Sequence, residues 1–487
     1  MNSTLKHPLN YLLICCCLVL CACGAPSNDM GGIDASGGRI AGTVSTGAIN
    51  GFGSVIVNGV RYNSDKAKIL INNQVATEDN LRTGYQVKIT GSIESNGSAL
   101  ADTIEFSPNL VGAITNINLT AQQLTVLGHL VQVNSATLFD AAIKPNYLAG
   151  LKLGDAILVS GFYDDQGVIT ATRIELNSNA NRQAMGYISY LNDANFTFNI
   201  KTLSVNYSAA ALSNFNYTAL AANTLVVVTG SLDAKGVLQA KTLVRINNNL
   251  DKDIKSAETE GFITRFVSTS DFDVAGTRWA AGTQTIFETG SSANLALGIA
   301  LSIKGEINST GILTAQKVEF KSAPKNEIAG EVTSITPLAS GNIAAGSLQI
   351  SGTTIQTNSK TAFEDKGIAN LKRFNFNSIN TGDFLKISGY SNQGIFIATK
   401  IERQDVKAEN NTEIKFNGII TTIGTHSFTL YGRIVLTNSE TIIIDNNRKE
   451  IAEAQFYLQA IGKRVRVEGI LKNGIFTASN IEIAEEN

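Results

Sequence analysis

The amino-acid sequence predicts an all-β protein: six tandem small, OB-like β-barrel units after a lipoprotein signal peptide. Three observations support this prediction. A glycine-marked strand pattern recurs six times, turn residues stand at fixed distances from it, and all five cysteines lie within the first 23 residues. The length of 487 residues favours several domains over one core, and a hydrophobic content of 43% is enough for packed interiors.

Each repeat contains a strand of alternating apolar residues that ends on a glycine. Apolar side chains stand two and four positions before this anchor glycine, and a period of two indicates a strand with one buried face. Seven residues before the anchor stands another glycine, or Asn223 in the third repeat, so we expect a left-handed turn into the strand. The anchor glycines are Gly91, Gly161, Gly230, Gly305, Gly389 and Gly469.

A hairpin follows each anchor glycine, and its returning strand breaks the alternation. An alanine is followed three residues later by Ile, Leu or Val, as in Ala101/Ile104 and Ala171/Ile174. Two apolar residues three apart face the same side of a strand only across a bulge or a sharp bend, which small barrels need in order to close. We therefore predict that each repeat closes into a barrel of five or six strands.

The repeats divide the chain into six copies, numbered 1 to 6, with an insertion in copy 5. Residues 1–22 are predicted to be the signal peptide and residues 23–41 a lipid-anchored flexible tether. A continuous β-solenoid is the alternative architecture, but a spacing of 69 to 84 residues between anchor glycines argues against its short, regular rungs. The copies span 42–106, 110–176, 183–245, 259–320, 327–403 and 414–483.

The first copy carries a pattern that resembles a known family. The run Gly51-Phe52-Gly53-Ser54-Val55-Ile56-Val57-Asn58-Gly59-Val60 is followed by Leu81, Gly84 and the alternating strand that ends at Gly91. This pattern resembles the bacterial domain of unknown function numbered 5666, most fully in copy 1, because the other copies lose Gly-Phe-Gly-Ser. The resemblance implies small β-barrel units in exported proteins and lipoproteins. It implies no activity and no catalytic residues.

The N-terminus has the pattern of a secretory signal, with Lys6 before an apolar run over 11–20 and small residues after it. Leu20-Cys21-Ala22-Cys23 resembles the bacterial lipobox, which implies cleavage after Ala22 and lipidation of Cys23. An ordinary cleaved signal that is rich in cysteine is the alternative. By resemblance to enterobacterial lipoproteins, Gly24 in place of Asp implies the outer membrane. We therefore expect a chain anchored there by lipid, facing the periplasm or the cell surface.

Residues with evident chemistry are sparse in the body of the chain. No cysteine follows Cys23, which excludes disulfides and thiolate metal sites there. His129 and His426 lie in different copies, and we interpret both as surface residues. Without a nucleophile–base pair, a phosphate loop or a calcium loop, we predict no enzyme, no cofactor and no metal. A net charge of −2 and 7% aromatic residues also disfavour nucleic acid as a partner.

A carboxylate recurs near the end of the returning strand. A basic residue stands two positions earlier in three copies, at Arg173, Lys317 and Lys400. One interpretation is a repeated polar contact, either between copies or to a cation. We favour a solvated strand end, whose charge pairs each contribute under about 1 kcal/mol. The carboxylates are Glu105, Glu175, Glu319, Glu402 and Glu482, with Val244 at this position in copy 3.

These observations favour a non-catalytic cell-envelope lipoprotein, a string of separate barrels that binds, spaces or scaffolds. Its expected partners are the membrane, through the lipid anchor, and an envelope protein or a glycan. The alternative is a glycan- or peptide-recognition protein that uses the diverged copy 5. The insertion of that copy carries Phe374 and Phe376, which we expect to be exposed and to contact the ligand.

Overall fold

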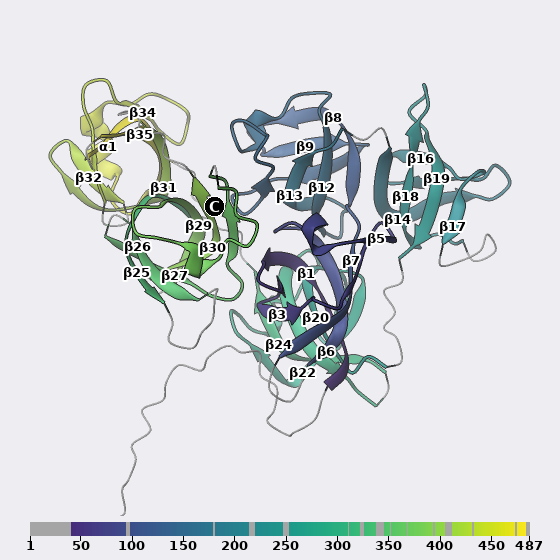
Figure 1. Cartoon of the computed structure of the whole chain (residues 1–487). Helices are drawn as coiled ribbons and strands as arrows, with labels where there is room; N and C mark the ends of the chain where they lie inside the picture. Colours follow the sequence, from purple (N-terminus) through teal and green to yellow (C-terminus); the bar gives the residue numbers. More distant parts are fainter. Residues whose placement is uncertain are drawn as a thin grey trace, which may run out of the picture. The chain divides into compact units, whose positions relative to one another are not determined.

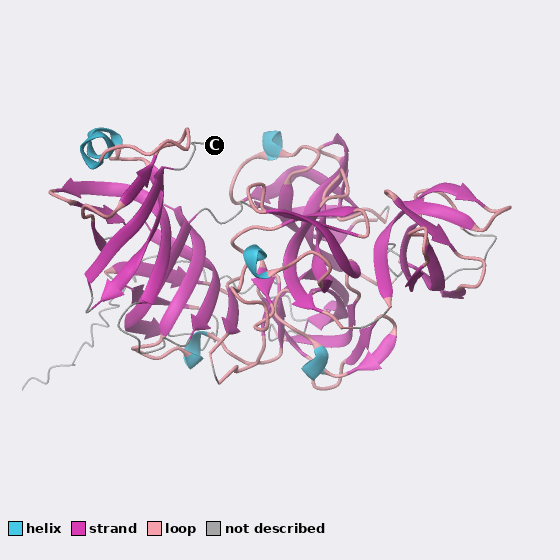
Figure 2. Cartoon of the chain, turned by 90° about the horizontal axis from the view of Figure 1, so that it is seen from above, coloured by secondary structure: helices cyan, strands magenta, loops and turns pink. Residues whose placement is uncertain are grey.

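Strands make up most of the computed structural model, and helices are short and few among the residues it describes (Figures 1 and 2). Copies 1 to 6 form the structural units that we call barrels 1 to 6. The described residues are 40–93, 98–178, 181–213, 220–246, 253–309, 311–321, 326–337, 345–350, 352–367, 369–392, 395–404, 412–430, 433–472 and 475–483.

The strands follow one order in every barrel. Barrel 1 contains β1 (Ile40–Gly51), β2 (Val55–Val57), β3 (Val60–Asn63), β4 (Lys68–Ile71), β5 (Gln74–Ala76), β6 (Gln86–Ile93) and β7 (Ala99–Phe106). Barrel 2 contains β8 (Leu110–Asn118), β9 (Gln123–Val126), β10 (His129–Gln132), β11 (Leu138–Phe139), β12 (Ala156–Tyr163) and β13 (Ile169–Leu176). Barrel 3 contains β14 (Arg182–Asn192), β15 (Thr197–Ile200), β16 (Leu203–Asn206), β17 (Ala211–Ser213), β18 (Leu225–Leu232) and β19 (Leu238–Arg245).

The second half of the chain repeats this order. Barrel 4 contains β20 (Ser256–Ser268), β21 (Asp271–Val274), β22 (Thr277–Phe287), β23 (Ala300–Ile307) and β24 (Leu313–Phe320). Barrel 5 contains β25 (Asn326–Pro337), β26 (Gly346–Ile350), β27 (Thr353–Thr357), β28 (Ala362–Asp365), β29 (Phe384–Asn392) and β30 (Ile395–Gln404). Barrel 6 contains β31 (Thr412–Gly424), β32 (Ser427–Leu430), β33 (Arg433–Leu436), β34 (Ile442–Ile444), the helix α1 (Glu453–Gln459), β35 (Arg464–Lys472) and β36 (Ile475–Ile483).

Each barrel closes through the same ring of strand pairs. In barrel 1 the ring runs β1–β2–β3–β7–β6 and returns to β1, with β3 and β7 parallel and the other pairs antiparallel. The equivalent ring closes in barrels 2 to 6. This is a five-stranded Greek-key barrel of the OB type, so the predicted fold of six small β-barrel units is confirmed.

The anchor glycine lies at the bulge that closes each barrel. In every copy the register between the last two strands shifts at this glycine, as at Thr90/Gly91 in barrel 1. A Cβ atom on the glycine would lie 1.9 to 2.3 Å from a carbonyl oxygen of the last strand, so no larger residue fits. The bulge turns both Ala101 and Ile104 into the core, as the spacing of three predicts.

The turn that leads into the penultimate strand is left-handed in every copy. Its residue has a φ between +63° and +91°, and the one non-glycine, Asn223, has the lowest value. This agrees with the prediction from the Gly/Asn pattern. The residues are Gly84, Gly154, Asn223, Gly298, Gly382 and Gly462.

Strand pairing also joins whole barrels in twos, which overturns the expectation of separate units on a string. Barrels 1 and 4 share one sheet through the parallel pair β1–β20, barrels 2 and 3 through β8–β14, and barrels 5 and 6 through β25–β31. Because β8 and β14 pair at Leu110 and Ala184, the cores of barrels 2 and 3 merge into one apolar cluster.

The predicted tether, residues 23–41, overlaps β1, which begins at Ile40, so its last two residues belong to a strand. The predicted signal peptide and Cys23 lie outside the described residues. Among the residues that are described, no helix is long and apolar enough to cross a membrane.

The anchor glycine predicts a large and local cost of substitution. Gly305→Ala should destabilise barrel 4 at or beyond the upper end of the ~1–3 kcal/mol typical of overpacking, because its Cβ would lie 2.0 Å from Thr314 O. Trp279 is the single tryptophan and is fully buried in this barrel, so its fluorescence in a denaturant titration reports barrel 4 alone. The control is Gly311→Ala, where nothing lies within 4 Å and only a left-handed φ is strained, at about 1 kcal/mol. Equal effects of the two substitutions would contradict the close-approach argument.

Candidate functional site: a buried charge junction between barrels

Two of the recurring carboxylates lie in a buried charge cluster, contrary to the favoured interpretation of solvated strand ends. Glu402 and Lys400, on β30, and Arg173, on β13, are each under 5% exposed, and Glu175 is largely covered. They are covered because barrels 1, 2 and 5 meet here, so the interpretation as a contact between copies is correct for these positions. We call the group formed by Arg173, Glu175, Glu364, Lys366, Lys400 and Glu402 the charge junction.

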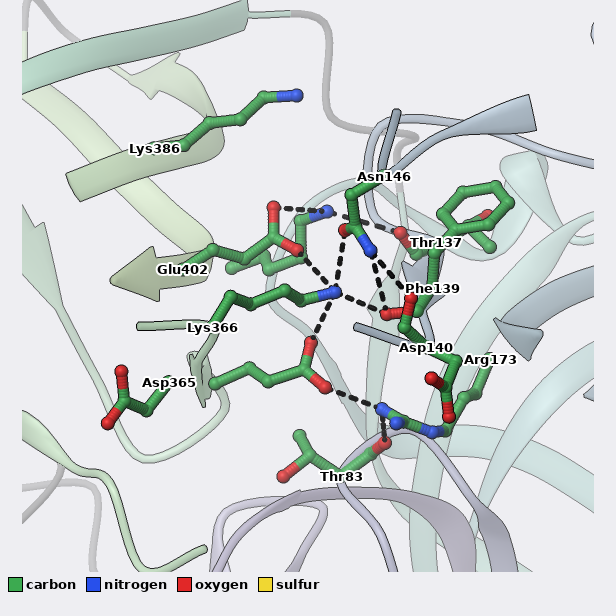
Figure 3. Close-up of polar contacts among 12 residues, drawn as sticks. Thr83, Thr137, Phe139, Asp140, Asn146, Arg173, Asp365, Lys366, Lys386 and Glu402 are labelled. Carbon is green, nitrogen blue, oxygen red and sulfur yellow. Dashed lines mark hydrogen bonds and ion pairs between the residues drawn. The ribbon is translucent and has the colours of Figure 1, made fainter. Parts of the chain in front are cut away.

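Arg173 connects three barrels. Its guanidinium forms an ion pair with Glu175 of its own strand. It also lies 2.7 Å from Glu364 Oε1, on β28 of barrel 5, a contact that Figure 3 draws as a dashed line. The same Nη1 donates to the carbonyl oxygen of Thr83 in barrel 1, at 3.2 Å. A planar guanidinium with several N–H donors suits such a meeting point, because it can bind acceptors in several directions at once.

Lys366 is enclosed by four oxygens, from barrels 2 and 5. Its Nζ lies 3.0 Å from Glu364 Oε2, 3.2 Å from Glu402 Oε1 and 2.7 Å from Asn146 Oδ1 (Figure 3). It also donates to the carbonyl oxygen of Phe139. Lys400 completes the junction, with its Nζ 3.2 Å from Glu402 Oε2 and 3.1 Å from the Thr137 carbonyl oxygen of barrel 2.

The electrostatics of the junction are balanced. Burial alone raises the pKa of Glu402, but the ammonium groups of Lys400 and Lys366 outweigh it and hold that pKa at about 2. Burial likewise disfavours the charged form of Arg173, but Glu364 and Glu175 raise its pKa above the usual value. Three cations thus face three carboxylates, and each buried charge has an opposite partner. Such an arrangement holds surfaces together in one geometry.

Hydrogen bonds extend the contact between barrels 1 and 2. The Thr172 hydroxyl donates to Gly84 O at 2.6 Å, and the Gln86 N–H donates to Ser160 Oγ at 2.9 Å. The Tyr85 hydroxyl donates to Glu175 Oε2 at 2.8 Å. The left-handed turn at Gly84 therefore has a second role, because it brings this segment of barrel 1 against the last two strands of barrel 2.

A third carboxylate of the series lies at another contact. Glu319, on β24 of barrel 4, forms ion pairs with Lys360 of barrel 5 and with Lys321, the latter at 3.3 Å. Of the remaining two, Glu105 is exposed, and Glu482 is half-buried and pairs with Arg466 of its own barrel at 2.8 Å. The solvated interpretation is therefore correct for barrels 1 and 6 only.

Phe374 and Phe376 are buried, so the prediction that they are exposed ligand contacts in copy 5 is wrong on exposure. Both are 1% exposed and pack in the core of barrel 5. Asp365 explains the burial, because its carboxylate accepts hydrogen bonds from the backbone N–H groups of Gly367 and Leu371 and pairs with Arg403 at 2.5 Å. These bonds fold the insertion back over the barrel end, with the Arg403 guanidinium 4.7 Å from the Phe374 ring centre.

The two histidines differ. His129 is 2% exposed, which corrects its assignment to the surface. The β15–β16 turn of barrel 3 lies on its hairpin, where the Thr202 hydroxyl donates to Gly128 O at 3.1 Å, and burial lowers the pKa of His129. His426 is exposed as expected, with its Nδ1 2.8 Å from a Glu453 carboxylate oxygen. The part of the chain that the structure describes contains no group of three or more His, Cys, Asp and Glu residues that could hold a metal ion.

Fold and junction together define a class of protein: tandem OB-like barrels joined by shared strands and buried ion pairs. A family model described as Domain of unknown function (DUF5666) matches residues 111–175, 260–319, 329–402 and 417–482, which is more than half of the chain. The chain belongs to this family. The matches fall in copies 2, 4, 5 and 6, so the family model does not support the expectation that copy 1 carries the pattern most fully. No curated protein and no solved structure matches the chain.

The charge junction predicts that Glu402 contributes far more to stability than Glu482, its counterpart in barrel 6. Glu402→Gln should destabilise the docking of barrel 5 by ~3–5 kcal/mol, because it leaves the buried Lys400 ammonium without its anion and Lys366 with only one of its two. Glu482→Gln, at the same strand position in barrel 6, should cost under about 1 kcal/mol. Hydrogen exchange on β28 and β30, against β34 and β36, separates the two effects. Similar losses of protection would contradict the junction.

The low pKa of Glu402 sets the direction of its acid dependence. Since the pKa is depressed in the folded chain, its contribution is complete above pH ~4.5, the ordinary range for Glu. It is lost as the pH falls through about 2. The difference in exchange between wild type and Glu402→Gln should therefore be constant from pH 7 to 5 and disappear in stronger acid.

The raised pKa of Glu258 predicts that the stability of barrel 4 has the opposite pH dependence. This residue of β20 pairs in register with Ser45 of β1, and burial raises its pKa to about 7 although Lys304, Lys360 and Lys321 act to lower it. Because the folded chain favours its protonated form, stability should fall as the pH rises through about 7. The urea midpoint of Trp279 fluorescence should be higher at pH 6 than at pH 8. Glu258→Gln should remove the difference, and the exposed Glu306→Gln should keep it.

Proposed function

We propose that this protein is a non-catalytic cell-envelope lipoprotein that acts as a scaffold. It would be anchored through Cys23 and would hold its barrels in a fixed arrangement by the charge junction. The observation that carries the proposal is the burial of the side chains of Arg173, Lys366, Lys400 and Glu402, each under 7% exposed, between barrels that are distant in the sequence.

The partners of these charges favour a structural role over a catalytic one. A general acid, a base or a nucleophile must reach a substrate, and it must be able to exchange a proton there. The junction ammonium groups instead contact carbonyl oxygens of barrel 2 and carboxylates of their own barrel, for example Thr137 O and Glu402. A network in which each charge already has its partner gains rigidity and loses reactivity.

The burial of these charges also supports a scaffold role. Replacing buried ion pairs by apolar residues often costs nothing or stabilises a protein, so their value lies in selecting one docking geometry. A displacement of barrel 1 or barrel 5 would break a contact of Arg173, because Thr83 O and Glu364 must both lie within reach of its guanidinium. A scaffold needs this fixed geometry in order to present several surfaces at constant spacing.

The anchor and the scaffold can be tested together in cells. Cys23→Ser should abolish acyl labelling and release the chain from the membrane fraction, because only the thiol of Cys23 is expected to carry lipid. The matched control is Cys21→Ser, two residues away, which should remain acylated. Crosslinking in intact cells should capture an envelope partner with the wild type and lose it with Cys23→Ser. An unanchored chain that keeps its partner and restores a deletion strain would contradict the proposal.

A further inference from the structure

Two of the contacts between barrels use the same small element, a four-residue turn with the sequence Asn-Ser-x-Thr. In barrel 2 it is 134–137 and in barrel 5 it is 358–361. The Asn134 N–H donates to Thr137 Oγ1 at 3.1 Å, and the Thr137 hydroxyl donates to Ala171 O at 2.8 Å. Barrel 5 repeats this geometry, with distances of 3.0 and 2.8 Å. Both turns are therefore rigid and fixed to the last strand of their own barrel.

The barrel 2 turn lies on the last two strands of barrel 5, and the barrel 5 turn lies against the last strand of barrel 4. Ser388 Oγ and Lys400 Nζ of barrel 5 donate to Ser135 O and Thr137 O of the barrel 2 turn, at 3.0 and 3.1 Å. In the other contact, Lys360, at the third position of the barrel 5 turn, pairs with Glu319 on the last strand of barrel 4.

The contact between barrels 2 and 5 is reciprocal. The barrel 2 turn lies on the last strand of barrel 5, and Glu364, on the short strand after the barrel 5 turn, binds Arg173 on the last strand of barrel 2. Two barrels of this fold can therefore pair face to face. A reciprocal contact is the kind that two identical subunits make across a two-fold axis.

Barrel 6 has the same turn and the same face, and both are open to solvent. Its turn, 438–441, repeats the bonds of the other two at 3.0 and 2.7 Å, and residues 438–440 are exposed. On its last two strands Arg466 lies across from Glu482, as Lys386 lies across from Glu402 in barrel 5. The side chains of Arg466 and Glu482 are 56% and 39% exposed, against 30% and 4% for Lys386 and Glu402.

The charges of barrel 6 are complementary between turn and face. In the established contact the turn residue is basic, Lys360, and barrel 4 has Ser302 across from Glu319. In barrel 6 the turn residue is acidic, Glu440, and the residue across from Glu482 is Arg466. The turn residue is therefore basic in barrel 5 and acidic in barrel 6, and the strand face of barrel 6 carries a cation, Arg466, where that of barrel 4 has Ser302. Ile442, which directly follows the turn and is 48% exposed, adds apolar surface to the same region.

We propose that barrel 6 binds barrel 6 of a second copy of this chain, with the turn 438–441 of each copy on the Arg466–Glu482 face of the other. Glu440 of each copy then pairs with Arg466 of its partner. The contact is weak by itself, and anchoring of both copies to one membrane would raise their effective concentration. The inference goes beyond the scaffold proposal, because barrel 6 alone makes the contact and no envelope partner takes part in it.

Disulfide trapping in cells tests the arrangement, since no cysteine follows Cys23. Two differently tagged full-length chains, one with Glu440→Cys and one with Arg466→Cys, should form a disulfide-linked pair in an oxidising envelope. The control replaces Arg466→Cys by Val75→Cys, a residue that is 80% exposed on β5 of barrel 1, and should give no pair. Equal trapping by both combinations would show random collision, and no trapping by either would remove the proposal.

Charge reversal gives an independent test on the full chain extracted in mild detergent. Arg466→Glu should weaken self-association at least tenfold in sedimentation, because Glu440 then meets two carboxylates. Adding Glu440→Arg to this variant should restore it. Lys88→Glu, which reverses the charge at the same strand position of barrel 1, should change nothing. The proposal fails if Arg466→Glu associates like the wild type, or if the double variant stays monomeric while its circular dichroism is unchanged.

Discussion

The close approach of the last two strands at the anchor glycine is the constraint on which the rest of the structure depends. A carbonyl oxygen of the last strand occupies the space where a side chain would begin, and the strand bulges at this point. The bulge returns the strand to the core at Ala171 and Ile174, and residues 173 and 175 consequently face outward together. Barrel closure and the outward presentation of Arg173 and Glu175 are therefore consequences of one backbone feature.

Two physically different contacts join the closed barrels. Barrels 2 and 3 merge their cores, so their contact depends on apolar burial and tolerates small shifts of side chains. Barrels 1, 2 and 5 meet through buried charges, which are costly to desolvate and therefore tolerate little displacement. The first kind of contact contributes affinity, and the second fixes the relative orientation of barrels that are far apart in the chain. Lys366 illustrates the second kind, because its four oxygen partners come from two barrels.

Features that repeat within a copy could be predicted from the sequence, and features that arise between copies could not. The anchor glycines, the left-handed turns and the bulge all leave a local pattern, because each is required within some twenty residues of chain. The partners of Lys366 leave no such pattern, since Asn146 and Glu402 come from different copies. The burial of Phe374 and Phe376 escapes prediction from the sequence for a related reason. Aromatic residues in a polar insertion look exposed until the bonds of Asp365 to Leu371 and Arg403 fold the insertion inward.

Copy 3 shows separately which residues close a barrel and which residues contact another barrel. It keeps Gly230 at the bulge, where the backbone allows nothing else, but has Val244 where five copies have a carboxylate. Its barrel joins its neighbour through β8–β14 and a common core, and that contact needs no charge on the last strand. Positions inside the ring are thus set by closure, whereas the outer positions of the last strand vary with what each barrel touches. Barrel 6 retains a charged outer face although none of the described barrels covers it. By the same reasoning, this exposed face is the one that indicates a contact with another molecule.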